Sequence, residues 1–359
     1  MQNKNSIDLS QTSSFDYVLP EELIAQDPVE PRDACRLLIA SRAGDSPFKH
    51  VLFKNLSDHL HPGDLLVLND TRVLPARLQG VKKNGGAKVE VLFLNENKTI
   101  ENESAGKTWT ALVKPGRKLP MGTAVVLEDG TEIIIGKKLD DGVREVYFKD
   151  SLNPLLIMEK LGRLPLPHYI TNTHSEPEQY QTVYAKKEKE NSVASPTAGL
   201  HFTQELLEKL DAKGIKRTCI TLRVGLGTFR PVKEELISKH IMHKELCEVS
   251  DIAAKMIIET KKRGGRIIAV GTTVVRTLES FAKVFGTIRS GSLETDLFIT
   301  PGYKFKVVDA LITNFHLPKS TLLMLVAAFG GYDNLLSIYQ EAISERYRFF
   351  SFGDSLFLN

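Results

Sequence analysis

The chain has 359 residues, 42% hydrophobic and 25% charged, which is the composition of an ordinary globular protein, and its length predicts two domains. Its three cysteines, Cys35, Cys219 and Cys247, are widely separated and form no CxxC pair, which argues against a disulfide framework or a thiolate metal site. The net charge of +3 is too small to indicate a nucleic-acid binder through the overall field, so composition is neutral on RNA.

Neither a secretory signal nor a membrane segment is expected. The first fourteen residues are polar, and the longest late apolar run, Leu322 to Phe329, is too short to cross a bilayer. We therefore expect a cytoplasmic protein without a membrane anchor.

Residues 1–64 include FDYVLPEELIAQ and CRLLIASR, which resemble the later part of the chain more than the segments that follow them directly. From Leu65 to about Lys149, short β-rich segments such as ARLQGV, KVEVLFL and TEIIIGK lie between glycines and asparagines. We predict a small all-β, barrel-like domain at residues 65–150.

Beyond residue 150, the helical periodicity of FTQELLEKLDAKG and DIAAKMIIETKKRGG alternates with the apolar runs TCITLRV, RIIAVGTT and VDALITNF. This alternation is typical of an α/β domain. We predict a discontinuous α/β catalytic domain, residues 1–64 and 151–359, into which the β domain is inserted.

The first polar motif is NDTRV, near the expected junction of the two domains. Asn69, Asp70 and Arg72 are candidates for substrate binding at a hinge. An ordinary capped turn explains the same residues equally well.

The segment SVASPTAGLHFT places small residues, a proline and a glycine before an amphipathic helix. Thr197 and Gly199 are candidates for cofactor binding, because such a turn lets a ligand approach the backbone and offers N–H groups to an anion. His201 could move a proton as a neutral imidazole. The alternative is a structural histidine near a helix start.

The segment RVGLGTFRPV follows an apolar strand and contains two glycines two positions apart, a spacing that ordinary turns also use. An arginine fork can bind a carboxylate or phosphate, and an aromatic face can stack on adenine or lie against a sulfonium. The candidates for cofactor binding here are Gly225, Gly227, Thr228, Phe229 and Arg230.

The run RIIAVGTTVVRTLES predicts a strand, a tight glycine turn and a helix. Thr272 at the helix start and Arg276 one turn later could hold an anionic group. The GxGxxG pattern is absent, and a plain N-cap explains the threonine equally well.

Towards the end of the chain, Asp296, Asn314 and His316 lie at strand termini, where α/β proteins build ligand sites. Tyr347 and Arg348, in YRFFSFGD, could stack on a splayed base or simply close the core.

His240 and His243 have a spacing that metal sites use, but HEXXH is absent and no cysteine completes a zinc set. We therefore assign no metal.

Together and in this order, these segments resemble the S-adenosylmethionine:tRNA ribosyltransferase-isomerase family of queuosine biosynthesis, from about residue 15 to residue 355. The matching segments include GDLLVLNDTRVLPARLQG, SVASPTAGLHFT, RVGLGTFRPV, IIAVGTTVVRTLES, VVDALITNFHLPKSTLLMLVAAF and YRFFSFGD. Three positions depart from the family pattern: His168 replaces Pro, Ser195 replaces Ala, and Arg223 replaces His, which leaves no catalytic histidine at that strand.

The resemblance implies that the ribosyl unit of S-adenosylmethionine is transferred to 7-aminomethyl-7-deazaguanine in the anticodon loop of tRNA and isomerised. The cofactor is then consumed as a co-substrate and none is bound permanently. The products are epoxyqueuosine-tRNA, adenine and methionine, and we expect a monomer.

The resemblance also suggests roles for the site residues. His201 or His316 would be the general base, Arg230 or Arg276 would hold the methionine carboxylate, and Asp296 or Asn314 would orient the ribose or adenine. Two rival functions remain: another S-adenosylmethionine-dependent RNA transferase, such as a methyltransferase, and a catalytically silent tRNA-binding protein.

Overall fold

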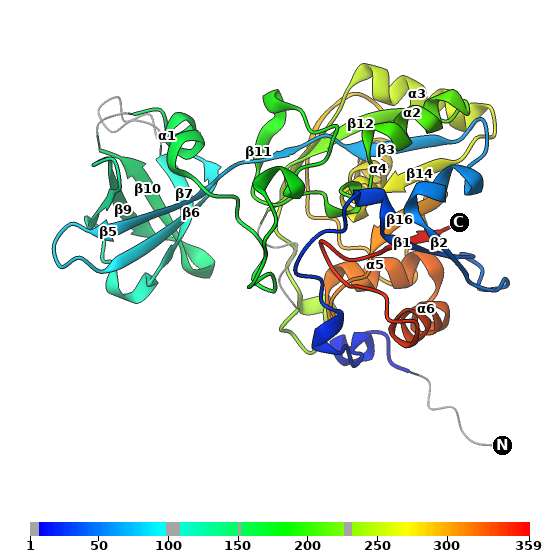
Figure 1. Cartoon of the computed structure of the whole chain (residues 1–359), viewed down its shortest axis with the longest axis horizontal. Coiled ribbons are helices and arrows are strands. Elements are labelled where there is room, and N and C mark those ends of the chain that lie inside the picture. The colour runs from blue at the N-terminus through cyan, green and yellow to red at the C-terminus, as the bar shows by residue number, and fades with distance from the viewer. Residues whose placement is uncertain (1–6, 98–107, 150–151, 226–231) are drawn as a thin grey trace. The chain divides into compact units, whose positions relative to one another are not determined.

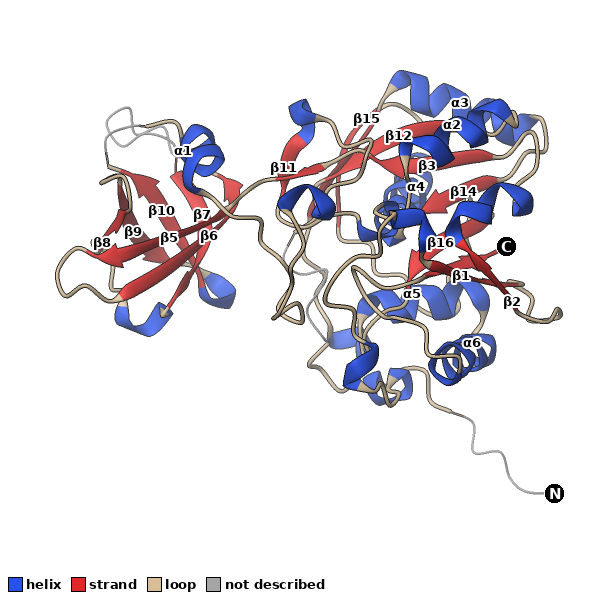
Figure 2. Ribbon diagram, in the orientation of Figure 1, coloured by secondary structure: helices blue, strands red, loops and turns tan. Residues whose placement is uncertain are grey.

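The computed structural model describes residues 7–97, 108–149, 152–225 and 232–359 (Figure 1). The chain divides into two compact units: residues 1–72, 168–189 and 195–359 form the larger, and residues 73–167 and 190–194 form the smaller. The larger unit contains a mixed sheet with helices, and the smaller unit contains a β-barrel (Figure 2). The predicted fold class, an α/β domain with an inserted barrel-like domain, is confirmed.

The smaller unit contains a closed antiparallel barrel, in the order β10-β7-β6-β5-β8-β9. Its strands coincide with the β-rich segments seen in the sequence. They are β5 (Arg77–Lys82), β6 (Lys88–Glu96), β7 (Thr108–Lys114), β8 (Ala124–Leu127), β9 (Glu132–Lys138) and β10 (Val143–Phe148). Helix α1 (Pro154–Leu161) belongs to the same unit. A separate two-stranded sheet pairs β4 (Arg72–Val73) with β11 (Glu190–Ser192).

The sheet of the larger unit has nine strands in the order β15-β13-β12-β3-β14-β16-β17-β1-β2. They are β1 (Arg36–Ala40), β2 (Lys49–Leu52), β3 (Leu65–Asn69), β12 (Lys216–Leu222), β13 (Glu245–Val249), β14 (Ile267–Val270), β15 (Gly291–Thr295), β16 (Ala310–Asn314) and β17 (Ser355–Leu358). The four central strands β12, β3, β14 and β16 are parallel. Strands β3, β14 and β16 are buried along their whole length, as in parallel sheets covered on both faces.

The domain boundaries in the structure differ from the expected ones. The segment that begins at Leu65 is not part of the barrel, because β3 pairs with β12 and β14 in the centre of the large sheet. Residues 152–167, which we placed in the α/β domain, belong to the smaller unit.

The five helices of the larger unit, among the described residues, are α2 (Gln204–Ala212), α3 (Asp251–Lys262), α4 (Thr272–Phe285), α5 (Thr321–Gly330) and α6 (Tyr332–Ser344). Side-chain hydroxyls cap three of them: Thr203, Ser250 and Ser320 accept hydrogen bonds from N–H groups of the first turns of α2, α3 and α5. No single helix in the described part of the chain is long and apolar enough to cross a membrane, and α5 and α6 reach that length only as a pair bent by 114°.

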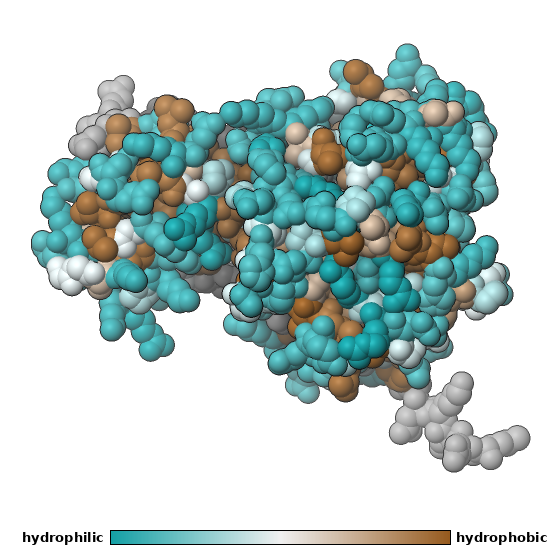
Figure 3. Space-filling model, in the orientation of Figure 1, coloured by the Kyte–Doolittle hydropathy of each residue, from teal (hydrophilic) through white to brown (hydrophobic). Residues whose placement is uncertain are grey.

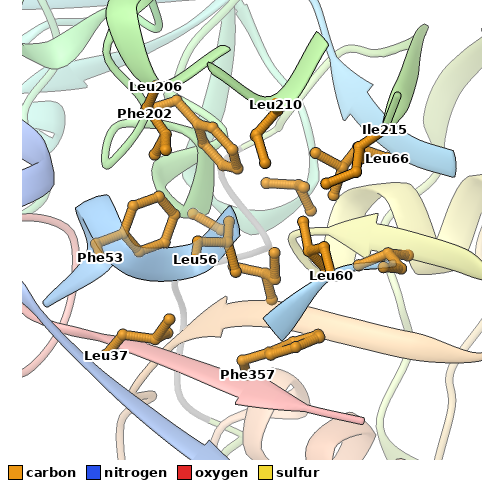
Figure 4. Close-up of a cluster of buried hydrophobic side chains, with 14 of the residues drawn as sticks. Leu37, Phe53, Leu56, Leu60, Leu66, Phe202, Leu206, Leu210, Ile215 and Phe357 are labelled. Carbon is orange, nitrogen blue, oxygen red and sulfur yellow. The ribbon is translucent and has the colours of Figure 1, made fainter. Parts of the chain in front are cut away.

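One face of the sheet packs on α2 and on the 3-10 segment Phe53–His59 through a cluster of buried side chains (Figure 4). Ala198 and Phe202 belong to this cluster, so hydrophobic burial anchors the turn that carries Thr197 and His201. Outside the cores, the face shown in Figure 3 is largely hydrophilic, with scattered apolar residues.

Candidate functional site

A pocket that is partly open to solvent lies in the larger unit. Its walls come from segments that directly follow β12, β14 and β16, where the carboxyl ends of parallel strands meet at one edge of the sheet. Residues 195–198, Tyr169, Phe350 and Ser351 complete it. The lining residues are Tyr169, Ser195, Pro196, Thr197, Ala198, Val224, Gly271, Thr272, Thr273, Thr313, Asn314, Phe315, His316, Leu317, Ser320, Leu322, Phe350 and Ser351.

Asn314, the last residue of β16, joins the pocket to the histidine behind it. Its Nδ2 lies 3.0 Å from the Phe350 carbonyl oxygen and 3.2 Å from His201 Nε2, and its Oδ1 lies 2.9 Å from Thr197 Oγ1. A carbonyl oxygen only accepts, so the amide nitrogen must face Phe350, and the second N–H then donates to Nε2. His201 therefore carries its proton on Nδ1, which lies 3.3 Å from Cys35 Sγ.

His201 does not line this pocket. It is buried, its ring packs against Phe53, and it borders a second, smaller pocket together with Cys35 and Arg32. Burial, aided by the positive charges of Arg348 and Arg32, lowers the pKa of His201 to about 3. The imidazole is therefore neutral at physiological pH, and neither ring nitrogen is directed at the main pocket.

His316 does line the main pocket. Its backbone N–H donates to the Tyr339 hydroxyl at 2.9 Å, and its carbonyl accepts from the Tyr17 hydroxyl, so the main chain is fixed. Nε2 lies 3.2 Å from Thr313 Oγ1, and Nδ1 has no hydrogen-bond partner among the described residues. Burial lowers the pKa of His316 to about 3, so this imidazole is neutral as well.

The amino terminus of α4 opens into the same pocket. Gly271, at φ +93°, makes the turn from β14 and is an N-cap without a side chain, and Thr272 and Thr273 follow it in the pocket wall. Asn69 supports this end, because its Nδ2 donates to Thr273 Oγ1 at 3.3 Å and to the Leu222 carbonyl at 3.1 Å. An uncapped helix start offers N–H groups and positive potential to an anion.

Arg276 is engaged elsewhere. It forms an ion pair with Glu245 in which both side chains are less than 5% exposed, and its Nε donates to the Leu297 carbonyl at 3.2 Å. Glu245 Oε1 in turn accepts from the Gly225 N–H at 2.8 Å. Through Glu245, the ion pair therefore holds the backbone at Gly225, in the segment RVGLGTFRPV. Arg276 is not among the residues that line the pocket.

Asp70 and Arg72 lie in polar contacts of their own. Asp70 accepts from the Thr221 hydroxyl at 2.7 Å and pairs with Lys186 at 3.0 Å, and Arg72 pairs with Glu178 at 2.8 Å. The structure therefore gives both residues intramolecular partners and places neither in the pocket.

Tyr347 and Arg348 support the core near the end of the chain. The Tyr347 hydroxyl lies 2.9 Å from His50 Nδ1, and Arg348 donates to the carbonyls of Asp27 and Phe352. Both side chains bond to other parts of the protein. This agrees with the alternative that Tyr347 and Arg348 close the core and do not stack on a base.

Asp296 is exposed just beyond β15 and does not line the pocket. Gly199 lies in the turn after Thr197, where a Cβ would come within 1.9 Å of the Tyr184 hydroxyl, so its role is close packing. The remaining candidates fall outside the described residues: Gly227, Thr228, Phe229 and Arg230.

Sequence reasoning missed several lining residues. Tyr169 and Phe350 form an aromatic wall with ring centroids 4.8 Å apart, and Ser351 accepts or donates a hydrogen bond at 2.6 Å to the Tyr169 hydroxyl. Phe350 and Ser351 stand in the YRFFSFGD motif, which we did flag, but nothing in the spacing around Tyr169 indicated a site.

The described lining contains no Asp, Glu, Lys or Arg, and its one histidine is neutral. Such a site provides hydroxyls, an amide, an imidazole, aromatic faces and a helix start. It suits a ligand with a neutral heterocycle and a small anionic group. Within the described part of the chain, no group of three His, Cys, Asp or Glu could hold a metal ion.

Comparison with known proteins agrees with the motifs. A family model described as queuosine biosynthesis protein matches residues 12–358. Proteins named S-adenosylmethionine:tRNA ribosyltransferase-isomerase are similar to this chain. One from Symbiobacterium thermophilum is 51% identical over 348 residues, covering 96% of this chain and 99% of that protein. One from Moorella thermoacetica is 49% identical over 346 residues, covering 96% and 98%.

A crystal structure of S-adenosylmethionine tRNA ribosyltransferase from Thermotoga maritima is also similar, with 40% sequence identity and a TM-score of 0.55. The match covers 97% of this chain and 100% of that one. The resemblance drawn from the motifs is thereby confirmed. Because a family model spans nearly the whole chain and full-length relatives share about half of its residues, the chain belongs to the queuosine biosynthesis protein family.

Proposed function

We propose that this protein transfers and isomerises the ribosyl unit of S-adenosylmethionine onto 7-aminomethyl-7-deazaguanine at the wobble position of tRNA. The products are epoxyqueuosine-tRNA, adenine and methionine. The observation that carries the proposal is the convergence of five family-matching segments on one pocket, whose described lining is uncharged. They contribute Thr197, Val224, Thr272, Asn314 and Phe350.

The reaction asks three things of the site: acidifying a proton beside the sulfonium, stabilising the departing adenine, and holding the aminomethyl group as an uncharged nucleophile. The described residues of the lining are neutral and largely buried, which supports the third task, because desolvation disfavours the ammonium form of an amine. The aromatic wall of Tyr169 and Phe350 offers faces for adenine and for the sulfonium.

The methionine carboxylate fits the amino terminus of α4, with Thr272 and Thr273 beside it. This assignment replaces Arg276, which is paired with Glu245. S-adenosylmethionine is consumed in this scheme, so the protein needs no permanently bound cofactor.

We assign proton transfer to His316, because His316 lines the pocket and His201 lies behind Asn314. At neutral pH it is unprotonated, the form that a general base requires, although its low pKa makes it a weak base. Replacing His316 by Ala should lower turnover by roughly 10²- to 10⁴-fold with the fold intact. Near-normal turnover in this variant would remove His316 from the mechanism.

The tRNA must present an unstacked anticodon-loop base to reach the pocket, so shape, stacking and phosphate contacts should dominate its recognition. We expect tRNA affinity to fall steeply between low and moderate salt, because phosphate contacts release counterions. A flat response would contradict phosphate-dominated docking. Light scattering would test the expected monomer of 40.0 kDa.

The decisive experiment incubates the protein with S-adenosylmethionine and tRNA carrying 7-aminomethyl-7-deazaguanine, and follows adenine release and nucleoside mass. Adenine, methionine and epoxyqueuosine support the proposal. S-adenosylhomocysteine would indicate a methyltransferase, and tRNA binding without turnover would indicate a silent binding protein.

A further inference from the structure

We propose that His201 is a positioning residue that fixes the Thr197 hydroxyl as a hydrogen-bond acceptor for the nucleoside of S-adenosylmethionine. This inference rests on the proposed function, because the nucleoside is that of its co-substrate. It assigns His201 a task different from proton transfer.

Each hydrogen bond of the Asn314 side chain has a fixed direction. The Phe350 carbonyl fixes the amide nitrogen of Asn314, whose second N–H needs an acceptor, and His201 Nε2 at 3.2 Å supplies it. The amide oxygen is then turned towards Thr197 and accepts the hydroxyl proton at 2.9 Å.

This orientation of Asn314 makes the Thr197 hydroxyl an acceptor towards the pocket. Thr197 has one hydroxyl proton, and Asn314 takes it, so the hydroxyl can only accept from a ligand. Thr197 lines the pocket and is only partly buried, so its lone pairs are within reach of a ligand. Carboxylates often bind ribose hydroxyls in nucleotide sites, and the described lining contains none. A ribose hydroxyl or the adenine amino group would donate to Thr197 instead.

The His201 imidazole must stay neutral for this arrangement to hold. A doubly protonated His201 would direct an N–H at the N–H of Asn314, and Asn314 cannot turn its amide without losing the Phe350 carbonyl. Burial and the positive charges of Arg348 and Arg32 oppose protonation of the His201 imidazole. Cys35 lies next to Nδ1 and stays a thiol, because burial raises the pKa of its Sγ. The surroundings of the ring therefore preserve the tautomer that Asn314 requires.

A matched pair of variants of the full-length protein tests the inference. In His201→Gln the carbonyl oxygen can reach the position of Nε2 and accept from Asn314, whereas in His201→Asn the shorter side chain reaches only the position of Nδ1. We expect His201→Asn to lower kcat/KM about tenfold or more, and His201→Gln to stay within about threefold of the wild type. Thr197→Val should lose about tenfold, and adding His201→Asn to it should cost little more, because both act through one hydrogen bond.

Binding of S-adenosylhomocysteine, measured by calorimetry, identifies the donor without requiring turnover. Analogues lacking the 2′-hydroxyl, the 3′-hydroxyl or the adenine amino group are compared in wild type and Thr197→Val. The analogue that lacks the group bound by Thr197 should have the same affinity for both proteins. The other analogues should bind the wild type more tightly than Thr197→Val.

Several outcomes would overturn the inference. Equal losses in His201→Asn and His201→Gln, at equal melting temperatures, would show that only the imidazole volume matters. Loss of an acidic limb of the pH–rate profile in His201→Gln would show that His201 titrates in catalysis. Normal turnover in both His201 variants would refute the inference and leave the proposed function intact, whereas a wild type that binds no S-adenosylmethionine would refute both.

Discussion

The buried pair of Arg276 and Glu245 allows a sharp test of how the pocket is built. Arg276→Met leaves the Glu245 carboxylate in a place where it is only 5% exposed, without its cation. Removing one partner of a buried ion pair typically costs about 3–5 kcal/mol. We expect a loss of that size in the free energy of unfolding, measured by urea denaturation with a tryptophan-independent signal such as circular dichroism.

The double variant Arg276→Met/Glu245→Gln is the matched control. It removes the uncompensated charge and keeps an amide oxygen as acceptor for the Gly225 N–H, so it should be more stable than Arg276→Met alone.

The competing explanation is that Arg276 grips the methionine carboxylate. Under it, Arg276→Met would lose S-adenosylmethionine affinity at least a hundredfold while unfolding with less than about 1 kcal/mol of change. That result would contradict a structural role for Arg276.

Two further predictions concern stability. Burial lowers the folded-state pKa of His201 and His316 to about 3, so the unfolded chain binds protons at these histidines more readily than the folded chain does. Their contribution to the free energy of unfolding is therefore fully present above about pH 6.5 and is lost as the pH falls from there towards 3. Each histidine contributes up to about 1.4 kcal/mol per pH unit in that window. In His201→Gln, the free energy of unfolding in urea should therefore fall less steeply between pH 7 and 5 than in the wild type. The same pH dependence in both proteins would contradict this prediction. Gly199→Ala should destabilise by about 1–3 kcal/mol, because its Cβ would lie 1.9 Å from the Tyr184 hydroxyl, whereas Gly116→Ala, with open space, should be neutral. Adding Tyr184→Phe to Gly199→Ala should recover part of the loss in melting temperature, and no recovery would place the strain elsewhere.

Much of the local structure follows from the sequence alone. Strand and helix positions follow from hydrophobic periodicity, which depends on neighbours a few residues apart, and so the barrel strands and the alternation of the α/β unit were predictable. Thr272, Asn314 and His316, which the sequence marks at strand ends, all line the pocket, because the carboxyl ends of parallel strands meet at one edge of the sheet.

The partner of each polar side chain, in contrast, depends on how distant parts of the chain pack together. His201 and His316 look alike as candidate bases in the sequence, yet one lies behind Asn314 and the other in the pocket. Arg276 pairs with Glu245, 31 positions away in the chain, and not with the carboxylate of a ligand. Strand β3 pairs with β12, about 150 residues away, and this pairing places β3 in the large sheet and not in the barrel. Hydrogen-bond and ion-pair partners depend on long-range packing and side-chain direction, neither of which leaves a period in the sequence.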